Sequence, residues 1–405
     1  MRKSKNLLGY SLNCIRRYRL RTVVVLVCLA VGASVFSSVA FLKDGLTAES
    51  EVSLKYSPDL TVQGISSGRQ THVSTHYISR IYGITGVSAV TQRIWGYGNV
   101  GNTLIVVLGI DLQSMATLQN TVVNPAEAYQ IASGTFLDPQ QNGTVVIGKG
   151  VASLLGAKVG NILTIMSESN RQFSYEIVGV FNSESEIYNA DTMLMNIFDA
   201  REFFDVPEDK VTDLMVYVSS TYAASKEVLV NLAARSISEL PNCRVITKDL
   251  LVKAQATAYG ERSGFFSIVW YVLLISVAIV AFNQTVVVGH ESKFEIGLLK
   301  ALGFSTADII QVRLIESIVL GTLAGAIGLT FGIIYDTLIG APVLRDFMLG
   351  WAALYPGFSL PVLISAQTVL LTFAITIIPL LFATVIPSWL NATVDPDIAM
   401  RGTRA

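Results

Sequence analysis

Few side chains in this sequence of 405 residues have the type and spacing that catalysis or metal binding requires. His72 and His76 stand four residues apart, a spacing that would place two imidazoles on one face of a helix. No cysteine or carboxylate joins them at ligand spacing, so we interpret both as surface histidines rather than a metal site. No nucleophile has a recognisable base motif beside it, and the sequence therefore predicts no catalytic residue.

Recognition of nucleotides or nucleic acid is not indicated either. The phosphate-binding pattern G-x-x-x-x-G-K-[ST] does not occur, and the nearest string is Gly148-Lys149-Gly150. Charged residues make up 15% of the chain and the formal net charge is −1, which leaves no basic excess to bind a phosphate backbone. We expect no nucleic-acid partner.

One acid stands out because it falls in an apolar stretch. Glu316 lies near the start of residues 314–335, and carboxylates inside a membrane are costly and often functional. Near the end of such a stretch, however, the side chain can also reach water. Glu316 is thus either a candidate intramembrane functional acid or a solvated one.

The elements that must position these groups are dominated by four long apolar stretches, residues 22–42, 263–289, 314–335 and 365–390. Each is long enough to cross the roughly 30 Å hydrocarbon core as a helix. The first is longer than the apolar core of a signal peptide and lacks a clear small-residue cleavage site, so we interpret it as a span rather than a cleaved leader. The sequence predicts an α-helical membrane protein with four transmembrane helices and a large α+β extracytoplasmic domain between the first and the second.

Basic residues near the spans predict the orientation. Residues 1–21 carry seven arginines and lysines and no acid, which indicates a cytoplasmic N-terminus. Four crossings then place the C-terminus in the cytoplasm as well. The segments between the spans are an extracytoplasmic domain with helical stalks at 43–262, a cytoplasmic loop at 290–313, an extracytoplasmic loop at 336–364 and a cytoplasmic tail at 391–405.

The long segment 43–262 mixes strand and helix patterns. Alternating and β-branched runs predict strands at residues 56–64, 103–110, 143–148, 162–166, 175–180 and 213–218. Helical spacing predicts helices at 76–82, 151–155, 199–204 and 223–239, and helical stalks at 41–54 and 248–259. Of the three cysteines only Cys243 falls in this segment, so we expect its apolar core to hold it together, in one or two subdomains.

The loop 290–313 holds the sharpest local pattern. Phe294, Leu298, Ala301 and Leu302 stand at i, i+4, i+7 and i+8, which predicts one apolar face of a short amphipathic helix. Gly303 can adopt the left-handed conformation that ends such a helix. By its pattern alone, the helix could equally lie on the bilayer surface or against a partner.

The third span has start and packing signals of its own. Ser305 followed by Asp308 matches a capping box, which predicts the start of the helix. Gly321 and Gly325 form a G-x-x-x-G step that permits close helix packing. The contact could lie within the subunit or across a dimer, and we favour the first.

At these residues the chain resembles the FtsX/MacB-like permeases of ATP-binding cassette (ABC) transporters. The family's Glu-Ile-Gly and Ala-Leu-Gly loop is matched by residues 295–303. Further matches are the basic entry to the first span at 19–22, the acid and glycines of the third span (Glu316, Gly321, Gly325, Gly328, Gly332), the stretch 143–180, and the tail through Pro387, Ala392, Asp395, Pro396 and Arg401.

The resemblance implies a permease subunit of the mechanotransmission type, which exports or releases a lipid, lipoprotein, peptide or drug. It implies a separate ABC ATPase that binds ATP and Mg²⁺, so this chain is expected to be no enzyme and to carry no cofactor. The other partners that it implies are a second permease subunit, as a homodimer or heterodimer, the lipids of the plasma (inner) membrane and an extracytoplasmic adaptor. The ATPase-coupling residues that it implies are Phe294, Glu295, Gly297, Leu298, Lys300, Ala301, Leu302 and Gly303.

A membrane sensor or regulator, whose outer domain binds a signal and controls a partner, is the main alternative. The predicted cytoplasmic parts contain no kinase, cyclase or dimerisation domain, which favours a subunit that is driven by a partner. A passive channel or secondary transporter would need more spans and polar residues at mid-membrane depth. Asn283 and Gln284 lie toward the cytoplasmic end of the second span instead.

Overall fold

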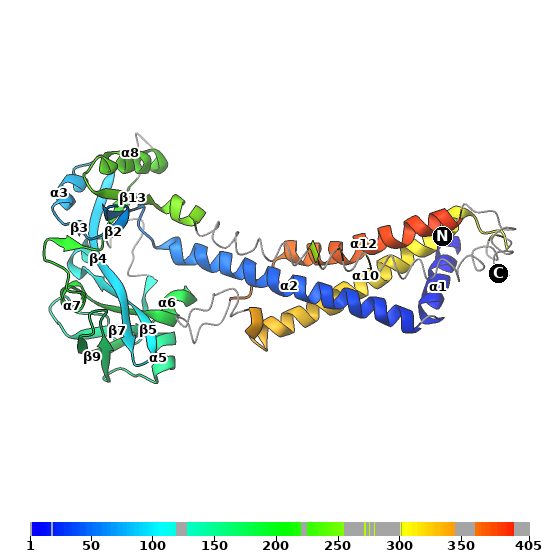
Figure 1. Cartoon of the computed structure of the whole chain (residues 1–405), viewed down its shortest axis with the longest axis horizontal. Coiled ribbons are helices and arrows are strands. Elements are labelled where there is room, and N and C mark those ends of the chain that lie inside the picture. The colour runs from blue at the N-terminus through cyan, green and yellow to red at the C-terminus, as the bar shows by residue number, and fades with distance from the viewer. Residues whose placement is uncertain are drawn as a thin grey trace. The chain divides into compact units, whose positions relative to one another are not determined.

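The computed structural model describes residues 2–17, 19–118, 128–219, 225–254, 271–272, 275, 279, 300, 302–344 and 361–392 (Figure 1). The chain divides into two compact units. The helical unit comprises Met1–Leu46, Gly260–Met348 and Val362–Ala405, and the β-rich unit comprises Thr47–Tyr259 and Leu349–Pro361. Each unit has a hydrophobic core of its own.

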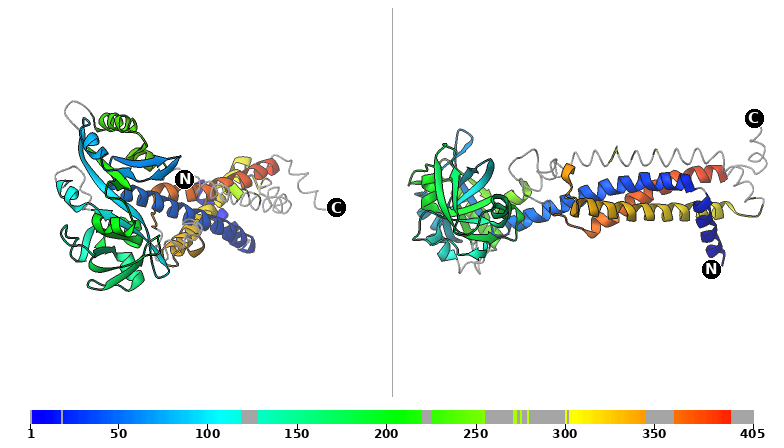
Figure 2. Two further views of the ribbon diagram at one scale, coloured as in Figure 1. Left: turned by 60° about the vertical axis from the view of Figure 1, so that its left-hand side comes forward. Right: turned by 90° about the horizontal axis from the view of Figure 1, so that it is seen from below.

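The described helices of the helical unit are α1 (Arg2–Arg17), the part of α2 (Arg19–Lys55) that precedes Thr47, α10 (Thr306–Thr337) and α12 (Ala366–Ala392) (Figure 2). Among the described residues, three helices are long and apolar enough to cross a membrane, namely Thr22–Lys55, Thr306–Thr337 and Ala366–Ile386. They correspond to the first, third and fourth predicted spans. The second, residues 263–289, lies outside the described residues except at four positions, so the count of four spans stays a prediction.

The helices are longer than the apolar stretches that predicted them. α2 begins at Arg19 and continues through the predicted stalk at 41–54 as far as Lys55. Residues 248–254 of the second predicted stalk are also helical. The basic N-terminal segment, where the sequence indicated no element, forms α1, and the Ser11 hydroxyl donates to the Val312 carbonyl of α10 at 3.4 Å.

Side-chain caps explain where α10 and α12 begin. The Asp308 backbone N–H donates to Ser305 Oγ at 3.2 Å, and the Ser305 N–H donates to the Asp308 carboxylate at 3.1 Å. This is the predicted capping box, and it starts α10 before the apolar stretch begins. At α12 the Thr368 N–H donates to Ser365 Oγ at 3.1 Å, so a polar cap again begins an apolar helix.

Glycines let α10 approach both neighbouring helices closely. A Cβ atom added to Gly321 or to Gly325 would lie 2.8 Å from Ile377 or Phe373 of α12. One added to Gly328 would lie 2.5 Å from Ala33 of α2. Such distances are shorter than a carbon–carbon contact permits, so only glycine fits at this spacing. The G-x-x-x-G step therefore packs within the subunit, as favoured above.

We expect Gly328→Leu to disrupt the contact between α10 and α2. The added side chain would meet Ala33 Cβ and the Ala30 carbonyl oxygen, and overpacking of this kind costs roughly 1–3 kcal/mol. Thermal unfolding of the purified full chain in lipid nanodiscs measures the effect. Ala326→Leu adds nearly the same bulk at an exposed position of α10 and serves as the control. Equal unfolding temperatures of the two variants would contradict this packing.

The β-rich unit is organised around an 11-stranded sheet with the order β13-β1-β12-β4-β5-β10-β7-β9-β6. β2 pairs with β1, β8 pairs with β4 and β9, and β3 pairs with β11 in a separate two-stranded sheet. The strands are β1 (Leu60–Ser66), β2 (Arg69–Thr71), β3 (Val73–Ser74), β4 (Val87–Val100), β5 (Thr103–Ile110), β6 (Gln130–Gly134), β7 (Thr144–Gly148), β8 (Ile162–Met166), β9 (Gln172–Asn182), β10 (Thr192–Asn196), β11 (Lys210–Val211), β12 (Asp213–Val218) and β13 (Cys243–Thr247).

Part of the large sheet closes on itself. Strands β4, β5, β10, β7, β9 and β8 form a ring, which the pair Asn99–Met166 between β4 and β8 closes. The pairings of β5 with β10 and of β7 with β9 are parallel, and the remaining ones are antiparallel. β4 is the strand that joins the two halves of the sheet, because its first half pairs with β12 and its second half with β5.

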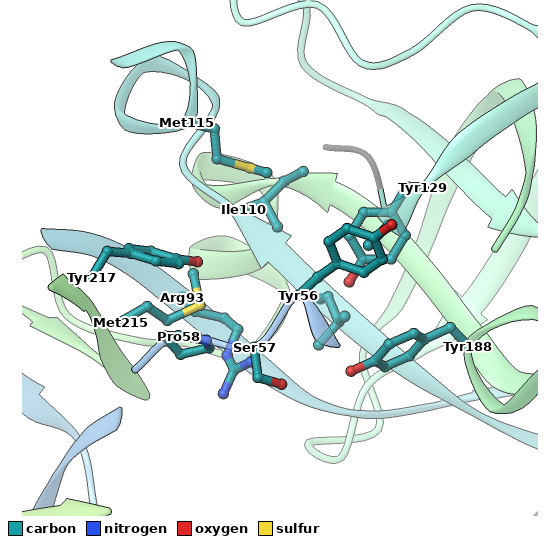
Figure 3. Close-up of a pocket in the computed structure, with 12 residues that line it drawn as sticks. Tyr56, Ser57, Pro58, Arg93, Ile110, Met115, Tyr129, Tyr188, Met215 and Tyr217 are labelled. Atoms are coloured by element: carbon teal, nitrogen blue, oxygen red, sulfur yellow. The ribbon is translucent and has the colours of Figure 1, made fainter. Parts of the chain in front are cut away.

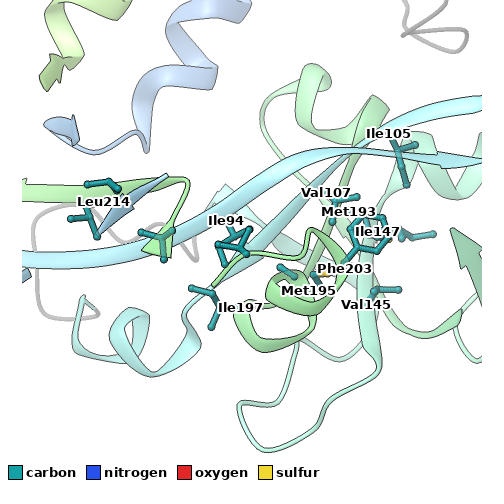
Figure 4. Close-up of a cluster of buried hydrophobic side chains, with 14 of the residues drawn as sticks. Ile94, Ile105, Val107, Val145, Ile147, Met193, Met195, Ile197, Phe203 and Leu214 are labelled. Atoms are coloured by element: carbon teal, nitrogen blue, oxygen red, sulfur yellow. The ribbon is translucent and has the colours of Figure 1, made fainter. Parts of the chain in front are cut away.

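Alternate residues of these strands point into one continuous core. Ile94, Ile105, Ile147 and Met193 come from four strands of the ring and gather with Phe203 (Figure 4). The intervening residues, such as Leu108 and Val146, build a smaller cluster on the other face of the sheet. Both faces of the sheet therefore carry apolar clusters.

Short helices complete the β-rich unit. They are α3 (Tyr77–Tyr82), α4 (Leu112–Leu118), α5 (Lys149–Leu155), α6 (Glu186–Asp191), α7 (Ile197–Phe203) and α8 (Lys226–Ser238). The strand predicted at 56–64 begins only at Leu60, because the preceding residues form the turn that leaves α2. Its partners β12 and β13 fix this start, since both pair with Leu60.

Candidate functional site

The predicted ATPase-coupling residues are only partly described by the structure. Phe294, Glu295, Gly297, Leu298 and Ala301 lie outside the described residues. Of the others, Leu302 is 69% exposed, and Gly303 has a φ of +92° with open space around its Cα. The left-handed conformation proposed for Gly303 is therefore present, and its N–H donates to the Lys300 carbonyl at 2.9 Å.

Glu316 has a partner that the sequence analysis did not assign. Its carboxylate accepts from Arg313 Nη1 at 2.7 Å, one turn earlier on α10, and the two side chains are 14% and 16% exposed. An ion pair of this kind lowers the cost of keeping a carboxylate near the membrane. The spacing of three residues could have indicated the pair. A functional role for Glu316 stays a prediction.

Two other carboxylates join helices of the helical unit, and sequence reasoning missed both. Asp44 of α2 accepts from Ser365 Oγ at 2.6 Å and from Thr368 Oγ1 at 2.7 Å, which ties α2 to the start of α12. Asp336 of α10 accepts a hydrogen bond from Ser38 of α2 and is 4% exposed. Asp44 falls in the predicted stalk 41–54 and Asp336 in the predicted loop 336–364, and the sequence indicated no partner on another helix for either acid.

The end of α2 is anchored in the β-rich unit by Glu49. This carboxylate is only 7% exposed, and its Oε1 accepts from Ser185 Oγ at 2.7 Å and from the Ile187 backbone N–H at 3.2 Å. Ser185 is the N-cap residue of α6, and its own side chain makes no cap bond to α6. Glu49 therefore caps α6 in place of a local side chain and places its negative charge at the positive end of that helix.

Three further contacts hold the same end of α2. The Tyr188 hydroxyl donates to the Ser53 carbonyl at 3.1 Å, and Lys55 pairs with Glu184 at 2.8 Å. Lys248 Nζ donates to the Lys55 carbonyl at 2.9 Å. We call these contacts and those of Glu49 the α2 joint. Most of them converge on residues 184–188, so the joint fixes the last two turns of α2 to one short segment.

The opposite end of α6 carries a buried acid. Asp191 is 6% exposed, and burial raises the pKa of Asp191 to about 6, although the Thr192 hydroxyl donates to it at 3.0 Å. A carboxylate at a helix C-terminus also faces the negative end of the helix dipole. The folded protein therefore favours the protonated form of Asp191.

We expect Asp191→Asn to stabilise the protein above pH 6 and to change little near pH 4. The folded pKa lies above the ordinary value of 3.8, so the folded state binds more protons between pH 4 and 6 and stability falls as pH rises through that window. The asparagine removes this loss, which is roughly 1–3 kcal/mol, and keeps an acceptor for Thr192. Thermal unfolding of the variant and of the unaltered chain at about pH 4.5 and about pH 7.5 measures this gain in stability. If the unfolding temperatures of the variant and the unaltered chain differ by the same amount at both pH values, the raised pKa of Asp191 is contradicted.

The histidine pair does not share a helix. His72 lies between β2 and β3, whereas His76 is the N-cap residue of α3, so the premise of two ligands on one helical face is wrong. Burial and the nearby Lys210 also lower the pKa of His72. Among the described residues, no group of three or more His, Cys, Asp or Glu side chains could hold a metal ion.

The string nearest to a phosphate-binding loop is not a loop in the structure. Thr144–Gly148 is the fully buried strand β7, and Lys149 is the first residue of α5. Backbone N–H groups of a strand are engaged with neighbouring strands and cannot cradle phosphates. This part of the chain therefore does not bind a nucleotide in the manner of a P-loop.

Comparisons with known families cover both units. The family model described as MacB-like periplasmic core domain matches residues 22–236, and the one described as FtsX-like permease C-terminal matches residues 266–396. An uncharacterized ABC transporter permease of Methanocaldococcus jannaschii is 27% identical over 218 residues, which are 53% of each chain. The lipoprotein-releasing system transmembrane protein LolC of Neisseria meningitidis serogroup B is 25% identical over 223 residues, 48% of each chain. The chain thus spans about half the length of the curated relatives it matches.

Solved structures were matched only distantly. The periplasmic region of MacB from Actinobacillus actinomycetemcomitans aligns with a TM-score of 0.35 and 12% identity, over 50% of this chain and 94% of that one. The extracellular domain of the transporter YknZ from Gram-positive bacteria aligns with a TM-score of 0.32 and 14% identity, over 46% and 99%. The family matches are what identify the protein: the chain belongs to the MacB-like periplasmic core domain family, and its C-terminal part matches the FtsX-like permeases.

Proposed function

We propose that this chain is the permease subunit of an ABC transporter of the mechanotransmission type. The observation that carries the proposal is the combination of a MacB-like core domain and an FtsX-like C-terminal part in one chain that also has apolar helices of membrane-spanning length. The relatives that bear the names of an ABC transporter permease and of LolC support the same class. A lipid, lipoprotein, peptide or drug is the class of molecule that it exports or releases.

ATP hydrolysis comes from a separate ABC ATPase in this proposal. The string nearest to a P-loop runs from the last residue of the buried strand β7 directly into α5, which supports an ATPase on another chain. The ATPase binds the loop that contains Phe294, Leu298 and Leu302, and ATP and Mg²⁺ are its cofactors rather than this chain's.

Motion reaches the β-rich unit through α2. This helix contributes residues to both units without a break, and the α2 joint clamps its end to α6 by a buried carboxylate and three further contacts. A helix held in this way transmits a rigid displacement rather than absorbing it. A change that the ATPase imposes at the cytoplasmic side therefore moves the β-rich unit, which lies outside the plasma (inner) membrane.

The assembly contains further partners. A second permease subunit completes a dimer with two ATPases, membrane lipids surround the spans, and an extracytoplasmic adaptor extends the β-rich unit. Both termini lie in the cytoplasm in this arrangement. The basic residues of 1–21 support that orientation.

Purification of the tagged full chain in mild detergent tests the proposal. We expect a P-loop ATPase to co-purify in stoichiometric amount and to hydrolyse ATP. Reconstitution of that ATPase with the purified chain should restore the complex, which excludes a contaminant. A folded, membrane-inserted chain that binds no ATPase would overturn the proposal and favour the sensor class.

A further inference from the structure

The face of the large sheet opposite its main core is not covered evenly. Leu108 and Ile110 belong to one apolar cluster on this face, and Met215 and Tyr217 belong to another. Between the two clusters lies a partly open pocket of about 50 Å³. Its wall is completed by residues 56–58, which connect α2 to β1 (Figure 3).

Arg93 of β4 supplies the charge in this pocket. Its Nη2 donates to Asp213 Oδ2 at 2.6 Å, and Trp95 Nε1 donates to the same oxygen at 2.8 Å. Gln63 Nε2 donates to Asp213 Oδ1 at 3.0 Å, so the fully buried Asp213 carboxylate is satisfied by three donors. Arg93 Nε, in contrast, is buried and has no hydrogen-bond partner among the described residues.

An unpaired guanidinium N–H in a buried position is costly, and a bound acceptor would relieve the cost. The Arg93 guanidinium lies beside Ser57 and Pro58 in the pocket (Figure 3). Burial raises the pKa values of Tyr129, Tyr188 and Tyr217, so these hydroxyls stay protonated. The Tyr188 hydroxyl already donates to the Ser53 carbonyl, so the donors that suit an anionic acceptor are the Arg93 Nε–H and the hydroxyls of Tyr129 and Tyr217.

The size of the pocket limits what can enter it. A volume of about 50 Å³ exceeds the roughly 10–15 Å³ that one water molecule needs, so it admits a group of a few heavy atoms. A carboxylate fits such a space. The side chains of Ile110 and Met115 line the pocket as well, and they can contact an apolar chain that extends from the carboxylate toward the opening.

We propose that this pocket binds the carboxylate end of an aliphatic acid, with the carboxylate on Arg93 and the chain along Ile110 and Met115. The site is separate from the ATPase-coupling loop and does not depend on the proposed transport function. Its wall includes Tyr188, whose hydroxyl bonds to the Ser53 carbonyl of α2, so an occupant lies against the α2 joint.

Two methionines on the wall make binding directly observable. The full chain contains 8 methionines, and Met115 and Met215 line the pocket whereas Met193 and Met195 are buried in the main core. We would label the methionine methyl groups with ¹³C in the full chain in nanodiscs, without any ATPase, and assign the two pocket signals with Met115→Leu and Met215→Leu. Octanoate is the probe, and octan-1-ol is the uncharged control of the same length.

We expect octanoate to shift the Met115 and Met215 signals in a saturable manner, while the Met193 and Met195 signals stay in place. Octan-1-ol should bind about tenfold more weakly or worse, because a charge-assisted hydrogen bond is lost. Signals that do not move up to the solubility of octanoate would overturn the proposal. Equal shifts with octan-1-ol would overturn it too, since they would show apolar partition alone.

Two variants separate the charge from the space. Arg93→Lys keeps a cation opposite Asp213 but removes the Nε–H, and we expect octanoate affinity to fall about tenfold. Ala128→Leu fills the pocket from its wall and should abolish the shifts, while the Met193 and Met195 signals report that the core remains folded. Unchanged octanoate affinity in both folded variants would place the binding elsewhere and contradict the site.

Discussion

Leu298→Asp is expected to abolish binding of the ATPase while the chain still inserts and folds. In the proposed complex, the apolar face of the loop helix lies in a groove of the ATPase, so the new aspartate would be buried there. Burying an unpaired charge costs several kcal/mol. A loss of about 3 kcal/mol corresponds to a more than hundredfold weaker complex. Titration of the purified ATPase against the chain in nanodiscs measures the affinity.

Ser292→Asp is the matched control for that variant. It adds the same charge, but at about 100° per helical residue it falls about 160° from Phe294 and about 120° from Leu298, outside the apolar face. We expect its affinity to stay within about threefold of the unaltered chain. A Leu298→Asp chain that binds the ATPase as tightly as Ser292→Asp does would refute the coupling face.

Glu49→Ala is expected to loosen the α2 joint without affecting ATP hydrolysis. The Ile187 N–H loses its carboxylate acceptor, and hydrogen bonds to charged groups contribute about 1.5–3 kcal/mol. Amide exchange at Ile187 should therefore accelerate about tenfold or more. Hydrogen exchange followed by mass spectrometry on peptides that span 183–190 measures this change.

Glu51→Ala provides the comparison, because Glu51 is an exposed glutamate two positions further along the same helix. It should leave exchange at Ile187 unchanged. The ATPase rate of the complex should stay within about twofold for both variants, since neither residue lies in the loop 290–313. If amide exchange at Ile187 is as slow in Glu49→Ala as in the unaltered chain, Glu49 is not the cap of α6.

Local patterns predicted much of the fold because local chemistry decides those elements. The strand predicted at 103–110 coincides with β5, whose β-branched and apolar residues cover both faces of the sheet. The capping box at Ser305 and Asp308 is also present, because it depends on residues three apart. The left-handed φ of Gly303 belongs to the same class of signals.

Long-range pairings could not be read in this way. β4 escaped prediction because its neighbour changes from β12 to β5 halfway along, so its burial pattern follows neither alternation nor a continuous apolar run. Glu49 and Ser185 are 136 residues apart, and nothing local marks either as half of a cap. The unpaired Nε of Arg93 likewise follows only from the assembled sheet.

In the proposed mechanism, ATP bound by the partner moves the β-rich unit through α2. Spin labels at Ser236→Cys on α8, in a chain whose three native cysteines are replaced by serine, report the distance between the β-rich units of two permease subunits. We predict that trapping the ATP-bound state shifts the distance distribution by several ångströms, and that Leu298→Asp abolishes the shift. Identical distributions with and without trapped ATP, in a complex that hydrolyses ATP, would contradict the account.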